Sequence, residues 1–160
     1  MGWLTSYRLR SRDAATRARA ARTLGVAGRT ANVASLEPLL DDEDPGVRRA
    51  AVEALGAIGG ESVAPHLLGA ARGADQVRPA TEAAVLRASA VEALAAVGGP
   101  AVPALLTAVS DRHTHLRECA VEALARIGGD GAAEGLRQAL ADDRSALRQI
   151  AAAALARSAG

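Results

Sequence analysis

Three similar segments decide the fold: AVEALGAIGG at residues 51–60, AVEALAAVGG at 90–99 and AVEALARIGG at 120–129. Each has apolar residues at helical spacing, a Glu near its middle and two glycines at its end. Apolar residues three and four positions apart form one face of an α-helix. A glycine ends a helix readily because it adopts the left-handed conformation without strain. Each segment therefore predicts an amphipathic helix that stops at its glycines.

Extending the alignment of these segments reveals a repeat along the chain. Its copies begin 31, 39, 30 and 31 residues apart. The second position is always Arg, at Arg17, Arg48, Arg87, Arg117 and Arg148. The ninth position is always Leu, at Leu24, Leu55, Leu94, Leu124 and Leu155. A fixed period of this length indicates stacked supersecondary units that bury their apolar faces against one another.

A second amphipathic stretch lies between successive copies, as in LEPLL at 36–40 and AVPALLTAV at 101–109. Each unit is therefore predicted to be an antiparallel helix pair joined by short turns. The units start near residues 2, 30, 61, 100 and 131, which makes residues 1–160 a single repeat domain. In the first unit, Trp3, Leu4 and Tyr7 are expected to cap the exposed end of the stack.

The segment AVPALLTAVSDRHTHLRECAVEALARIGG, at residues 101–129, resembles the short HEAT-like repeat first described in phycobilisome lyases. The resemblance extends from about residue 3 to about residue 158. It implies an all-α fold, a right-handed α-solenoid of about five HEAT-like helix pairs. It does not define an activity, because such repeats occur in scaffolds, lyases, hydroxylases and nucleic-acid enzymes alike.

Composition and charge narrow the class of protein further. The single cysteine excludes an internal disulfide framework and favours a reducing compartment, so we expect a cytoplasmic protein. No run of 18 apolar residues is present, which predicts no membrane span. Residues 1–29 hold seven Arg and one Asp, whereas the remainder holds 12 Arg and 17 acidic residues. The basic N-terminal end is thus set against an acidic body.

The repeated Arg is expected to be structural. A cation in the first turn of a helix opposes the helix dipole, so its recurrence predicts a compensating anion. Three Asp residues, each six positions before such an Arg, can supply the anion from the end of the preceding helix. We predict an Asp–Arg ladder between neighbouring units, comprising Arg17, Arg48, Arg87, Arg117 and Arg148 with Asp42, Asp111 and Asp142.

The repeated Glu is expected to lie opposite the buried Leu, on the concave side of the stack. Glu53, Glu92 and Glu122 then form either an ordinary solvated face or, with Glu118, an acidic stripe for a basic partner. A neighbouring column of small residues should line the same side smoothly enough for a helix or an extended peptide. These residues are Gly25, Gly56, Ala95, Ala125 and Ala156.

The unit of 39 residues carries eight extra residues within GADQVRPATEAAVL, at 73–86. Pro79 is expected to start the following helix early, so that it covers 80–97. Insertions in solenoids often lie on the binding face, although a tolerated loop extension is the equal alternative. The predicted partner-binding set is Glu53, Glu92, Glu122, Glu118, Arg49, Gln76, Arg78 and Glu82.

These features favour a non-enzymatic scaffold that binds another protein or a peptide on its concave face. One alternative is a bilin lyase-like or other modifying-enzyme subunit, which the resemblance alone suggests. Another is contact with nucleic-acid phosphates through the basic N-terminal end, which is disfavoured because basic and aromatic residues are confined to that end. No cofactor or metal is expected, since the three histidines lack ligand spacing. Cys119 is expected to be a small packing residue of its helix. The alternative is a functional thiol in contact with His115, which lies four residues earlier on the same helix.

Overall fold

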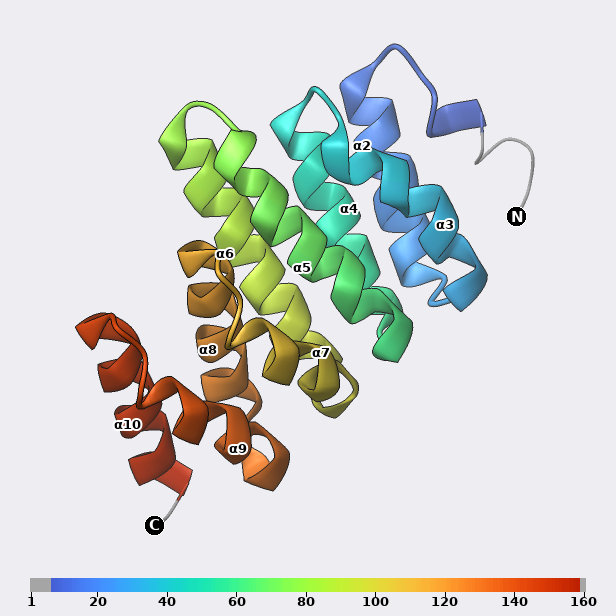
Figure 1. Cartoon of the computed structure of the whole chain (residues 1–160). Helices are drawn as coiled ribbons and strands as arrows, with labels where there is room; N and C mark the ends of the chain where they lie inside the picture. The colour runs from blue at the N-terminus through green and yellow to red at the C-terminus, as the bar shows by residue number, and fades with distance from the viewer. Residues whose placement is uncertain (1–6, 159–160) are drawn as a thin grey trace.

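The structure is a computed structural model that describes residues 7–158. The described chain forms two rows of helices, stacked from the N-terminus to the C-terminus (Figure 1). One row consists of α2 (Ala14–Val26), α4 (Pro45–Ile58), α6 (Ala80–Val97), α8 (Thr114–Ile127) and α10 (Ser145–Ser158). The other row consists of α3 (Val33–Leu36), α5 (Ala64–Gly73), α7 (Val102–Ala108) and α9 (Gly129–Ala139). The predicted all-α solenoid of helix pairs is confirmed.

Short 3₁₀ helices complete the second row at the ends of its α-helices, at Thr30–Asn32, Glu37–Asp41, Glu61–Val63, Ala74–Gln76 and Gly99–Ala101. Successive helices of the first row pack directly on one another, from α2 on α4 through to α8 on α10. Among residues 7–158, no single helix is long and apolar enough to cross a membrane. In the same range, one pair of segments, α6 and Gly99–Ala108, meets the requirement of length and composition when taken together, but the pair is bent by 113°.

The helix boundaries follow the local sequence signals. Asp44 caps α4 by accepting a hydrogen bond from the Val47 N–H, and Pro45 occupies the first turn. The first glycine after each of α4, α6 and α8 has a positive φ, between 66° and 70°. Only glycine adopts this conformation without strain, so the glycines stop these helices as predicted. The predicted early start of the helix at 80–97 is also confirmed, because α6 spans those residues.

The core lies between the two rows and is built from Leu, Val and Ala. The repeated Leu occupies its centre, since Leu55, Leu94 and Leu124 have no exposed surface. At the N-terminal end the expected cap is not seen in the described residues. Tyr7 is 72% exposed, and Trp3 and Leu4 lie outside the described range.

The first two positions of the small-residue column have a packing role. Gly25 and Gly56 are both buried where the next helix of the row approaches them. A Cβ on Gly25 would lie 2.6 Å from the Ala54 Cα, and one on Gly56 would lie 2.8 Å from the Ala93 Cβ. These two glycines therefore allow α2, α4 and α6 to approach one another closely.

Candidate protein-interaction groove

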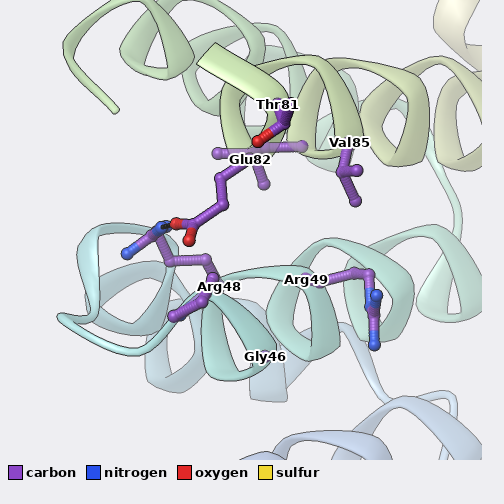
Figure 2. Close-up of a pocket in the computed structure, with 8 residues that line it drawn as sticks. Gly46, Arg48, Arg49, Thr81, Glu82 and Val85 are labelled. Atoms are coloured by element: carbon purple, nitrogen blue, oxygen red, sulfur yellow. Dashed lines mark hydrogen bonds and ion pairs between the residues drawn. The ribbon is translucent and has the colours of Figure 1, made fainter. Parts of the chain in front are cut away.

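A groove lies between α4 and α6, and we call it the α4–α6 groove. Its first part has a cavity volume of about 380 Å³ and lies between the N-terminal turns of the two helices (Figure 2). Val85 is at its edge, and 49% of the Val85 surface is exposed. The complete lining of this part is Pro45, Gly46, Arg48, Arg49, Thr81, Glu82, Val85 and Leu86.

The second part of the α4–α6 groove has a cavity volume of about 450 Å³. Its lining is Glu53, Gly56, Ala57, Ser89, Glu92, Ala93 and Ala96. The lining of the first part continues into that of the second part after one helical step, from Arg49 to Glu53 on α4 and from Leu86 to Ser89 on α6. Residues three or four positions apart lie on the same face of a helix, so both parts lie on one side of the helix pair. From Pro45 to Ala57 the groove extends about 18 Å at 1.5 Å per residue.

The insertion contributes to the α6 wall in the first part of this groove. The helix α6 has 18 residues, whereas α4, α8 and α10 each have 14. Its additional first turn supplies Thr81 and Glu82 to the lining. Gln76 and Arg78 are exposed and do not line the groove; Arg78 donates hydrogen bonds to the main-chain oxygens of Asp75 and Val77.

The repeated Glu residues are accompanied by arginines. Glu53 lies 3.6 Å from Arg22 of α2 and 3.5 Å from Arg49 of α4. Glu92 forms an ion pair with Arg126 of α8. The surface along the groove therefore carries mixed charge, which differs from the expected acidic stripe. Arg22 occupies in the first unit the column that holds Glu in the middle units, whereas Arg49 and Arg126 come from other columns of the repeat.

The two other predicted acidic residues lie on α8, away from the groove. Glu118 is half-buried and contacts His115 at 2.8 Å and Arg144. Glu122 is half-buried, and within residues 7–158 it forms no ion pair. Neither residue lines the α4–α6 groove. Glu118 instead links α8 to Arg144, the residue before α10.

Two arginines of the repeated column hold carboxylates of the following unit. Arg17 donates from Nε and Nη2 to the two carboxylate oxygens of Asp42, at 2.8 and 2.7 Å. Arg117 donates from Nε to Asp142 at 2.7 Å and from Nη2 to Asp143 at 2.8 Å. The Nη1 of each arginine donates to main-chain oxygens five or six residues earlier. This geometry fixes the guanidinium group and presents its Nε–Nη2 edge to a carboxylate.

The inserted unit interrupts this pattern. Arg48 makes the main-chain bonds through Nη1, but its Nη2 lies 3.4 Å from Glu82. Arg87 contacts Asp75 of its own unit at 3.2 Å. Asp111 is held by Arg72 at 2.7 Å and by His113. The eight extra residues change the register, so these arginines do not meet the Asp that a regular unit would present. The fifth arginine, Arg148, donates to main-chain oxygens of the preceding turn.

The Arg17–Asp42 pair predicts a pH-dependent contribution to stability. Burial acts to raise the pKa of Asp42, but bonds from Arg17 and from the Asp44 N–H outweigh it and lower the pKa. The pair therefore stabilises the fold above about pH 4, and this contribution is lost as the pH falls through the folded-state pKa. Asp42→Asn should lower the urea midpoint at neutral pH, and its difference from the wild type should shrink as the pH falls below about 4. Urea melts followed by circular dichroism at neutral pH and through the acid range test this; a constant difference would contradict it.

Cys119 lacks the environment of a nucleophile. It is buried in α8, and burial, together with the charges of Glu122 and Glu118, raises the pKa of its thiol to about 12. The thiol is thus protonated at neutral pH, and a protonated thiol is a poor nucleophile. His115 contacts Glu118 through Nδ1. Within residues 7–158, no three His, Cys, Asp or Glu residues are grouped as a metal site.

The basic N-terminal end is partly neutralised within the fold. Arg17 is buried against Asp42, and Arg22 lies beside Glu53. Exposed arginines remain at Arg8, Arg10, Arg12, Arg19 and Arg29. Phosphate binding would therefore depend on these residues alone.

Helix pairs stacked in one direction, with a groove along one row, define an α-solenoid repeat protein. The family is that of the HEAT repeats: their sequence profile matches residues 3–86 and 80–156, so the chain belongs to this family. The resemblance noted in the sequence is confirmed. Comparison with curated proteins gives no significant match.

Two solved structures show the same architecture. The first is the complex of CpcE and CpcF of phycocyanin lyase from Nostoc sp. PCC7120, which is similar at 25% identity, with a TM-score of 0.58. The match covers 97% of this chain but only 64% of that one. The second is an archaeal HEAT-like repeats protein from Thermococcus onnurineus NA1, at 14% identity with a TM-score of 0.58. That match covers 98% of this chain and 69% of the other.

Proposed function

We propose that the protein is a non-enzymatic interaction scaffold that binds a peptide segment of a partner protein in the α4–α6 groove. The observation that supports this most is the groove itself. It is lined by Gly, Ala and Ser along its floor, has a half-exposed Val85 at one end, and is flanked by charged residues. Small residues let a peptide backbone approach, and an exposed apolar side chain supplies an anchor.

The predicted partner-binding residues divide accordingly. Arg49, Glu53 and Glu92 line the α4–α6 groove and form the proposed binding set, with Val85 as a member that the sequence did not reveal. Glu82 also lines the groove, where it contacts Arg48. The other four predicted residues lie outside the lining, and we propose no direct contact for them; they are Gln76, Arg78, Glu118 and Glu122.

A displayed library of random 12-residue peptides, selected on the immobilised protein, tests this function. The dissociation constants of selected peptides are then measured by fluorescence anisotropy on the wild type, Val85→Arg and Val26→Arg. We expect Val85→Arg to weaken binding about tenfold or more, because it removes an apolar anchor and obstructs the groove. Val26 is 89% exposed at the end of α2, so Val26→Arg is the matched control and should bind as the wild type does. Failure to select binders, or equal affinity for both variants, would contradict the proposal.

The second candidate is a bilin lyase-like or other modifying-enzyme subunit. The similarity to the CpcE–CpcF complex favours it, because that complex pairs two chains. As such a subunit, the chain would bind and position a partner. The buried Cys119 thiol is protonated and does not suit covalent attachment of a bilin. Titration of the purified protein with free bilin tests this candidate: a shift of the bilin absorbance supports it, and an unchanged spectrum on the protein alone rejects direct bilin binding.

A further inference from the structure

Arg48 is the one member of the repeated arginine column that lines the α4–α6 groove. Its side chain is 12% exposed, and its Nε is buried without a hydrogen-bond acceptor among the described residues. Leaving a buried donor of a charged group unsatisfied is costly. From this defect we infer that the groove recognises an acidic side chain, Asp or Glu, of the partner peptide, through the Nε–Nη2 edge of Arg48. The inference rests on the proposed function of the groove.

Two other arginines of the same column show what the Nε–Nη2 edge binds where the following unit has the regular length. In Arg17 and Arg117, Nη1 is fixed by main-chain oxygens, while Nε and Nη2 each donate to a carboxylate oxygen at 2.7 or 2.8 Å. Arg48 has the equivalent main-chain bonds, to Asp42 at 2.7 Å and Glu43 at 3.1 Å. Its guanidinium group is therefore held in place for a carboxylate, and a fixed guanidinium edge favours two-point binding.

In the inserted unit, no carboxylate stands at the position that would meet this edge of Arg48; the nearest preceding Asp in the sequence is Asp75. Asp75 ends the first helix of the inserted unit, where it bonds Arg87. The residue six positions before Arg87 is Thr81, at the place where three of the other four units have Asp. Thr81 lines the groove together with Arg48, so the space beside Arg48 is part of the groove.

Glu82 occupies this space weakly. It makes one contact of 3.4 Å to Nη2, and its side chain is 38% exposed (Figure 2). A peptide carboxylate that bonds both Nε and Nη2 would replace this contact, and the flexible Glu82 side chain would turn toward solvent. Arg49 and Val85 flank the position, so the preferred peptide should carry an apolar residue close to its acidic one.

The selected peptides provide the test. For each, the dissociation constant is compared with that of its amide version, Asp to Asn or Glu to Gln, on the wild type, Arg48→Lys, Glu82→Gln and Arg148→Lys. On the wild type we expect the amide version to bind about tenfold more weakly or worse. On Arg48→Lys this difference should largely disappear, because lysine keeps the charge but lacks the planar edge. On Glu82→Gln the acidic peptide should bind more tightly, since its competitor is removed.

Arg148→Lys is the matched control, because Arg148 makes the same main-chain bonds outside the groove. It should leave both dissociation constants unchanged, and circular dichroism establishes that each variant is folded. Peptides that depend on Val85 but show no preference for the acidic version would overturn this inference and leave the proposed function intact. Weaker binding of the acidic peptide to Glu82→Gln would also overturn it. Peptides that do not depend on Val85 would instead overturn the proposed function.

Discussion

Leu124→Ala should lower the free energy of unfolding by about 2–5 kcal/mol, because it removes a buried side chain and leaves a cavity. Leu124 has no exposed surface and lies at the centre of the repeated pattern on α8. Its side chain covers Gly135 of α9, where an added Cβ would lie 2.6 Å from the Leu124 Cδ1. Removing Leu124 therefore opens a space between the two rows of helices, and helices have limited freedom to close it. Urea melts followed by circular dichroism measure the loss.

Leu140→Ala is the matched control, because it makes the same chemical change at a residue that is 42% exposed. It should change the free energy of unfolding by no more than about 0.5 kcal/mol, as most surface substitutions do. Glu92→Ala should also have a small effect, since Glu92 lies on the exposed side of α6. A loss from either control as large as that from Leu124→Ala would show that the repeated Leu is not the main source of stability.

The architecture could be predicted because its signals are local. Helical periodicity places Leu55, Leu94 and Leu124 in the core, and a glycine after each helix stops it with a positive φ. The start of α6 at Ala80 follows from Pro79 in the same way. Each of these features depends on residues within one or two turns of the chain, so a repeated pattern is enough to define them.

The groove depends on contacts between units, which periodicity does not specify. A helical wheel shows that Glu53 faces outward, but it does not show that Arg22 of another helix lies beside it. One signal was nevertheless present in the sequence: Thr81 stands six residues before the repeated arginine, where three of the other four units have Asp. That replacement marks the point where the ladder is interrupted and where Arg48 lines a groove.

Close packing between helices leads to the second large effect. Gly25→Ala should destabilise the protein by about 1–3 kcal/mol, even though alanine is the better helix former. The added Cβ would lie 2.6 Å from the Ala54 Cα and 3.1 Å from the Ala54 main-chain oxygen. Since these are backbone atoms of α4, a side-chain rotation cannot relieve the contact, and α2 must move away from α4. Thermal and urea melts of the purified variant measure the change.

Gly69→Ala separates this steric effect from helix propensity. Gly69 lies within α5, is exposed, and has no atom within 4 Å of an added Cβ. The same substitution should therefore stabilise the protein there by about 0.5–1 kcal/mol, because alanine loses less conformational entropy on folding than glycine does. The two changes should thus have opposite signs. If Gly25→Ala also stabilised the protein, the close approach of α2 and α4 would not be required for this fold.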